Sequence, residues 1–203
     1  MPDPGLHPEL NTEFWEGRYQ DGTARWDLGQ PAPPFVSLLN DVAAPPPGRM
    51  VVLGSGAGHD ALLFAKKGFE IVGVDFAPSA IAYAQRAAQA RHLSAQFIQR
   101  DIFDLETDYA GQFDYVLEHT CFCAIAPHQR PAYADLAHTL LHSGGEFIGL
   151  FWAHSRSGGP PFGTTPDDIR QLFSKRFQTI NLTHVTNSIE NRSPDEYLGR
   201  FKV

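Results

Sequence analysis

Three glycines and one acid have the residue types and the spacing of a nucleoside-binding site. The stretch VVLGSGAGHDALLFAKKGFEIVGVDF (51–76) places Gly54, Gly56 and Gly58 after one apolar run and Asp75 at the end of the next. Glycines allow a sharp turn from strand to helix and a close approach of a ligand to the backbone. A carboxylate at the end of the second strand can accept both hydroxyl groups of a ribose. The stretch therefore predicts a cofactor that contains adenosine.

Two other interpretations of the glycines stay open. The dinucleotide fingerprint G-x-G-x-x-G has its third glycine one position further along, where this chain has His59. An NAD-dependent oxidoreductase is therefore disfavoured. A packed turn without a ligand is the second alternative, but it does not require the correctly spaced acid.

A second acid follows the next apolar run and is expected beside the adenine. The segment AQFIQRD (95–101) ends at Asp101, and Ile102 and Phe103 come directly after it. Ligands of open α/β sheets bind in the crevice outside the carboxyl ends of the strands. Asp101 would supply a polar contact there, and the two apolar residues would form a wall.

The elements that must position these residues alternate along the chain. Apolar strand-like runs and helical patterns follow one another, which is typical of an α/β protein with a mostly parallel sheet. We expect a Rossmann-like, doubly wound, seven-stranded sheet with an antiparallel last strand. Its strands are predicted at 50–53, 70–76, 95–101, 113–119, 144–152, 179–185 and 197–203, and its main helices at 58–68, 78–91, 128–141 and 165–177.

The N-terminal quarter departs from this alternation. We expect a single domain over residues 1–203, with an N-terminal lid or cap at 1–47 and the Rossmann-like core at 48–203. The segment FWEGRYQDGTARWDLGQPAPPF carries aromatic residues among charges, prolines and glycines, which suits a lid better than a sheet.

Composition excludes several classes of partner. The net charge is −7, whereas nucleic acids and anionic membranes select basic surfaces. No run of 18 apolar residues is present, and the first ten residues lack the pattern of a secretory signal. The two cysteines, Cys121 and Cys123, fit free thiols in a reducing cytoplasm. We expect a cytoplasmic monomer or homodimer that binds a small molecule and no metal.

Several segments together resemble a known family. These segments are TARWDLGQPAPPF, LGSGAGHDALLFA, FDYVLEHTCFCAIAPHQRPAYADLAHTLL, GGEFIGLFW, SGGPPF and YLGRFKV. They are similar to the class I S-adenosylmethionine-dependent methyltransferases, within these to the thiopurine methyltransferase superfamily, and most of all to its halide/thiol methyltransferases. The resemblance spans about residue 12 to the C-terminus.

The resemblance implies a set of cofactor-binding positions. Aromatic lid residues of the family cover S-adenosylmethionine, and Trp15, Tyr19 and Trp26 stand at those places, with Tyr19 replacing a tryptophan. The other positions implied for the cofactor are Gly54, Ser55, Gly56, Asp75, Phe76, Asp101, Ile102, Glu118 and His119.

The resemblance also implies an acceptor pocket formed by His119, Cys123 and Trp152. The family more often has an aspartate and a tyrosine where Glu118 and His119 stand, and a tyrosine where Trp152 stands. These departures concern the acceptor more than the cofactor. We therefore favour thiols or hydrosulfide over halides, and selenium or tellurium species are further soft acceptors.

The expected reaction is an in-line methyl transfer to a small soft nucleophile. Because a thiol has a pKa of roughly 8.5, little proton removal is needed, and His119 is the candidate to accept a proton from a neutral thiol. One alternative is a methyltransferase acting on an oxygen or nitrogen atom of a metabolite, which would need a base. Another is a non-catalytic binder that retained the fold.

Overall fold

The computed structural model describes residues 10–203 and contains one seven-stranded sheet. The strand order is β3-β2-β1-β4-β5-β7-β6. The strands are β1 (Arg49–Leu53), β2 (Glu70–Asp75), β3 (Ala95–Gln99), β4 (Phe113–His119), β5 (Leu141–Trp152), β6 (Thr179–His184) and β7 (Glu196–Lys202). Strands β1 to β5 run parallel to one another, and β7 lies antiparallel between β5 and β6. The predicted sheet and its antiparallel last strand are confirmed.

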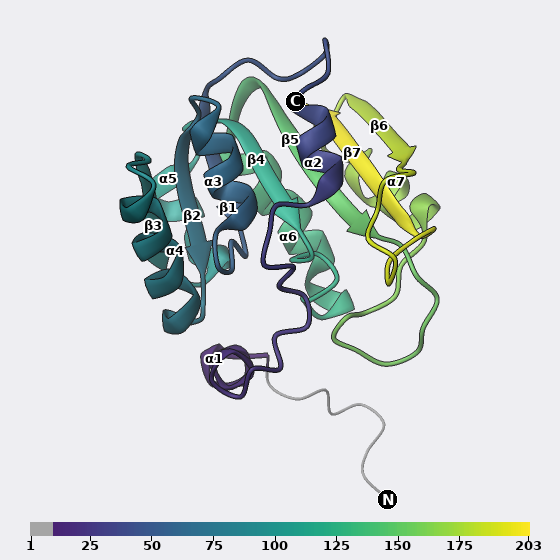
Figure 1. Cartoon of the computed structure of the whole chain (residues 1–203). Coiled ribbons are helices and arrows are strands. Elements are labelled where there is room, and N and C mark those ends of the chain that lie inside the picture. Colours follow the sequence, from purple (N-terminus) through teal and green to yellow (C-terminus); the bar gives the residue numbers. More distant parts are fainter. Residues whose placement is uncertain (1–9) are drawn as a thin grey trace, which may run out of the picture.

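Helices cover both faces of the sheet (Figure 1). The apolar side chains of α2 (Pro33–Leu38), α3 (His59–Lys66) and α4 (Pro78–Ala90) pack in one buried cluster. Those of α6 (Arg130–Leu140) and α7 (Pro166–Phe173) pack in the other. The shorter elements are α5 (Glu106–Tyr109) and the 3-10 turns η1 (Ile102–Asp104) and η2 (Pro127–Gln129).

Local chemistry explains the ends of several of these helices. Pro78 and Pro166 stand in first turns, where a missing N–H costs little. Thr165 caps α7 as predicted, since its side chain accepts a hydrogen bond from Asp168 N and the Asp168 carboxylate accepts one in return. β5 begins at Leu141, three residues before the predicted glycine start, because it follows α6 without a loop.

The predicted lid contains two helices. Helix α1 (Thr12–Gln20) is capped by Asn11, whose side chain accepts a hydrogen bond from Phe14 N at 3.0 Å. Figure 1 shows α1 below the sheet, whereas α2 lies against it. Phe35 of α2 is fully buried, so this end of the lid segment is part of the core. Residues 1–9 of the expected lid lie outside the described residues.

The order of the strands positions the site. It reverses between β1 and β4, which is the point where open α/β sheets bind ligands. The glycine loop follows β1, Asp75 ends β2, and His119 ends β4. Trp152 ends β5 at the same edge. Within residues 10–203, every helix is too short or too polar to cross a membrane.

Candidate active site

The glycine loop uses backbone conformations that side chains would obstruct. Gly54 and Gly56 have φ angles of +62° and +52°. A Cβ atom at Gly54 would lie 3.0 Å from the Sγ of Cys121, and one at Gly56 would lie 3.0 Å from the Tyr19 hydroxyl. The glycines therefore let the loop pass close under the lid on one side and close over the end of β4 on the other.

Asp75 stabilises the same loop. One carboxylate oxygen accepts a hydrogen bond from Gly56 N at 2.8 Å, and the other accepts one from Ala77 N at 2.9 Å. Burial raises the pKa of this carboxyl, and the hydrogen bonds from the backbone oppose that effect. The backbone N–H of Phe76 also donates to it, and since a carboxylate has about four lone-pair sites, Asp75 can still accept a hydrogen bond from a hydroxyl group. Phe76 follows it, half-buried, at the start of the turn into α4.

Asp101 lies at the end of the next strand but turns toward its own loop. Its carboxylate accepts a hydrogen bond from Phe103 N at 2.9 Å and so caps the 3-10 turn η1. Burial raises the pKa of the Asp101 carboxyl. Ile102 is buried beside it. Asp101 and Ile102 thus lie together at this edge of the sheet, and the Asp101 carboxylate is engaged by the backbone.

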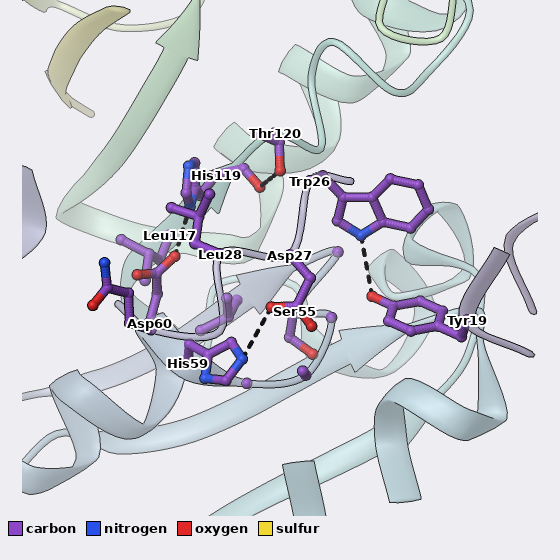
Figure 2. Close-up of a pocket in the computed structure, with 16 residues that line it drawn as sticks. Tyr19, Trp26, Asp27, Leu28, Ser55, His59, Asp60, Leu117, His119 and Thr120 are labelled. Atoms are coloured by element: carbon purple, nitrogen blue, oxygen red, sulfur yellow. Dashed lines mark hydrogen bonds and ion pairs between the residues drawn. The ribbon is translucent and has the colours of Figure 1, made fainter. Parts of the chain in front are cut away.

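The three lid aromatics form one cluster. The rings of Trp15 and Trp26 meet edge to face with centroids 5.2 Å apart, and those of Tyr19 and Trp26 do so at 5.6 Å. Trp26 Nε1 donates a hydrogen bond to the Tyr19 hydroxyl at 3.2 Å (Figure 2). Burial raises the pKa of the Tyr19 phenol, so this hydroxyl stays protonated.

Two acidic residues hold this lid on the core. Glu16 of α1 accepts hydrogen bonds from Ser79 N at 3.0 Å and from Ser79 Oγ at 2.5 Å, at the first turn of α4. Asp27 pairs with His59 at 3.0 Å, as Figure 2 shows, and this contact lowers the pKa of Asp27. His59, at the position of the missing third glycine, is thus a contact of the lid.

A cavity of about 50 Å³ lies between the lid and the glycine loop. Its walls include Tyr19, Trp26, Gly54, Asp60 and His119. The lid therefore stands over the glycine loop at the point where the strand order reverses.

His119 belongs to a chain of four charged or polar side chains. Its Nδ1 lies 2.7 Å from an Asp60 carboxylate oxygen, as Figure 2 shows, and its Nε2 lies 2.6 Å from Arg192 Nη1. Arginine can only donate, so Nε2 must accept and the ring hydrogen is on Nδ1, toward Asp60. Arg192 is buried and also pairs with Glu196 at 3.2 Å.

Arg192 connects this chain to both halves of the site. Its Nη2 donates a hydrogen bond to the backbone carbonyl of Trp26 in the lid at 3.2 Å. Its guanidinium lies 5.9 Å from the centre of the Trp152 ring at the end of β5. Asp60 binds the lid segment as well, because its other oxygen accepts a hydrogen bond from Ala32 N at 2.7 Å.

Glu118, near the end of β4, and Cys123, in the segment that follows β4, are both buried. One Glu118 oxygen accepts a hydrogen bond from Phe122 N at 2.8 Å, and the other has no partner within residues 10–203. Burial raises the pKa of Glu118 to about 7 and that of the Cys123 thiol to about 12. Cys123 is therefore a protonated wall residue rather than a nucleophile.

Several residues of the site carry no local signal in the sequence. Glu16 lies on a helix among other polar residues, Asp60 lies in the first turn of a largely apolar helix, and Arg192 and Glu196 lie near the C-terminus. Asp60 directly follows His59 at the start of a helix, which is the one hint available. Their contacts with the other residues of the site form only in the tertiary structure, which brings distant segments of the chain together.

Comparisons with known proteins agree with this geometry. A family model described as Thiopurine S-methyltransferase (TPMT) matches residues 10–199. Probable thiol methyltransferase 2 of Arabidopsis thaliana is 32% identical, with 97% of this chain and 88% of that protein covered. Thiocyanate methyltransferase 1 of Brassica oleracea is 34% identical, with 93% and 84% covered.

Solved structures share the fold. Burkholderia thailandensis 1,6-didemethyltoxoflavin-N1-methyltransferase, which holds S-adenosylhomocysteine, matches with a TM-score of 0.77 at 19% identity over 100% of this chain and 92% of that one. A second solved structure is described by the words "Conversion of a Disulfide Bond into a Thioacetal Group during Echinomycin Biosynthesis". It matches with a TM-score of 0.79 at 24% identity, over 94% of this chain and 91% of that one.

The sheet order, the glycine loop with its acid and the lid define an S-adenosylmethionine-dependent methyltransferase with a Rossmann-like core. Within this class, the chain belongs to the thiopurine S-methyltransferase family, whose model matches nearly all of it.

The residues present fit S-adenosylmethionine. Asp75 keeps acceptor capacity where a ribose is expected, and Gly54 and Gly56 leave space that a Cβ atom would fill. The hydroxyl of Ser55 is buried and has no hydrogen-bond partner within residues 10–203. Asp75, the glycine loop and the lid aromatics would hold the cofactor, whose sulfonium places an electrophilic methyl group in the site.

Proposed function

We propose that this enzyme transfers a methyl group to the sulfur of a small acceptor, most favourably a thiol or hydrosulfide, with halides as further acceptors. The names of the two plant relatives, which cover most of the chain at 32% and 34% identity, support a sulfur acceptor. We further propose that His119, Cys123 and Trp152 line the acceptor side, and that the cofactor is held by the positions given above for it. A small acceptor is the only partner that this requires.

The observation that carries the proposal is the hydrogen bond from Arg192 to His119. Since Nε2 accepts from Arg192 and Nδ1 donates to Asp60, neither ring nitrogen is free to take a proton from an acceptor. Oxygen and nitrogen acceptors need such a base, whereas a thiol with a pKa of roughly 8.5 supplies its own anion. His119 would then act as a positioning residue for Arg192.

The surroundings suit an anionic acceptor. Opposite charges cancel when an anion attacks a sulfonium, so a dry environment favours the transition state over the separated ions. Phe122 and Cys123 form a buried wall after β4, and the lid aromatics exclude water on the other side. Alignment of acceptor and methyl group by these walls would contribute several kcal/mol, on the order of known proximity effects.

The test is the pH dependence of methyl transfer to two thiols of different acidity. Production of S-adenosylhomocysteine and of the S-methyl product is measured with an alkyl thiol and with a more acidic aryl thiol. We expect the midpoint of kcat/KM to follow the pKa of each thiol. The same midpoint for both thiols would indicate a base on the enzyme, and it would favour an oxygen or nitrogen acceptor.

We also propose that the reaction takes place in the cytoplasm. Both cysteines are free and buried, which suits a reducing compartment.

A further inference from the structure

The end of β5 presents two buried N–H groups that have no acceptor. Trp152 Nε1 and His154 Nε2 are both buried and lack a hydrogen-bond partner within residues 10–203. Their rings lie side by side with centroids 4.4 Å apart. A buried donor without a partner is costly, so such groups in a native protein call for an explanation.

The hydrogen of His154 can be placed from its other contact. Nδ1 accepts a hydrogen bond from Arg156 N at 3.2 Å, so the ring hydrogen is on Nε2. Burial, with a contribution from the neighbouring Arg156, lowers the pKa of His154 and keeps the ring neutral. His154 Nε2 is therefore a donor, as the indole Nε1 of Trp152 always is.

Two guanidinium groups lie beside the Trp152 ring. That of Arg156 is 4.9 Å from the centre of the ring, and that of Arg192 is 5.9 Å from it. Two acids are also near: Glu196 pairs with Arg192 at 3.2 Å, and Asp195 opposes the effect of Arg156 on the pKa of His154. Two adjacent donors beside two cations would be satisfied by a group that only accepts hydrogen bonds and carries negative charge.

The loop that carries His154 is held in place by contacts that do not involve Trp152 Nε1 or His154 Nε2. Thr164 N donates to the His154 carbonyl at 3.1 Å. Arg130 donates from Nη1 to the Gly163 carbonyl and from Nη2 to the Phe162 carbonyl, both at 3.0 Å. His154 is therefore fixed by backbone contacts, and its Nε2–H is not needed to hold the loop.

We propose that Trp152 Nε1–H and His154 Nε2–H form an anion-binding recess for the methyl acceptor, which binds as a small soft anion such as a thiolate, hydrosulfide or thiocyanate. Arg156 and Arg192 supply the positive charge around this recess. The inference rests on the proposed sulfur methyltransferase function and adds His154 as a residue that selects the charge of the acceptor.

The test measures binding of thiocyanate to the complex of the enzyme with S-adenosylhomocysteine, in which no methyl group can be transferred. Calorimetry compares the parent with Trp152→Phe and His154→Phe, which keep an aromatic ring and remove the donor. His138→Phe is the matched control, because His138 packs edge to face on Phe177, away from the recess. We expect thiocyanate to bind roughly 10- to 100-fold more weakly to the first two variants and equally well to the control.

Further measurements separate the possible failures. Equal affinity for S-adenosylhomocysteine shows that a variant is folded, and His154→Gln, which restores a donor, should recover part of the thiocyanate affinity. Unchanged thiocyanate binding in both Phe variants, or no binding to the parent complex, would overturn the inference. The proposed function fails separately, if the parent forms no S-methyl product from any thiol.

Discussion

Arg192 donates a hydrogen bond to His119 over 2.6 Å, although the two residues are 73 positions apart in the chain. This contact makes the imidazole an acceptor and fixes the guanidinium, which also donates to the Trp26 carbonyl and pairs with Glu196. It supports the proposal that His119 positions Arg192 and does not act as a base.

The first prediction concerns the stability of this junction. Arg192→Leu leaves the carboxylate of Glu196, which is 1% exposed, without its cation. We expect the free energy of unfolding to fall by about 3–5 kcal/mol, since a buried charge has lost its partner. Denaturant unfolding of the single variant and of Arg192→Leu/Glu196→Gln checks this. The double variant should regain part of the loss, and equal instability of the two would show that the ion pair is not the cause.

The second prediction is a pH dependence that arises from Glu118. Its pKa is about 7 in the folded protein and 4.5 in the unfolded chain. The unfolded chain therefore ionises first as the pH rises, and the folded state loses stability between about pH 4.5 and pH 7. The total loss from this group should be about 3 kcal/mol. Above pH 7 its contribution should be constant.

Glu118→Gln removes this ionisation and keeps the acceptor for Phe122 N. Thermal or denaturant unfolding at several pH values should show a weaker decline of stability for the variant than for the parent across this window. Parallel curves for the two proteins would show that Glu118 does not ionise within it.

The third prediction concerns the lid. Glu16→Gln weakens the contacts with Ser79, whereas Glu13→Gln alters an exposed acid on the same helix and is the matched control. We expect Glu16→Gln to bind S-adenosylmethionine several-fold more weakly, because closure of the lid becomes less favourable. Hydrogen exchange over residues 11–30 should slow when the cofactor binds to the parent, and less so in Glu16→Gln. Exchange that the cofactor leaves unchanged in the parent would contradict a closing lid.

Much of the core follows from local patterns. Apolar runs, glycines and a proline at N1 predicted the seven strands and the main helices, and Gly54 and Asp75 were found because a fixed spacing along one strand-turn-helix unit connects them. The strand order then confirms that these ends share one edge of the sheet.

The contacts between distant segments could not be found in this way. His119 was selected from the sequence, but Asp60 lies 59 positions before it and Arg192 lies 73 positions after it. Glu16 and Ser79 are 63 positions apart. A charged residue near the C-terminus is most often solvated, and no periodic pattern distinguishes one whose partners are brought to it by tertiary packing. The chemistry of His119 was therefore undetermined until its neighbours were known.

The Asp75 carboxylate is proposed to bind the ribose of the cofactor, and calorimetry can measure this with S-adenosylhomocysteine and its 2′-deoxyribose analogue, on the parent and on Asp75→Ala. The carboxylate also holds Gly56 and Ala77, so weaker binding alone would not distinguish the ribose contact from a change in the loop; the analogue separates the two effects. We expect the parent to prefer the ribose form by about tenfold or more and Asp75→Ala to bind both forms equally weakly. Binding of S-adenosylhomocysteine to Asp75→Ala as tight as to the parent would show that the carboxylate does not bind the ribose.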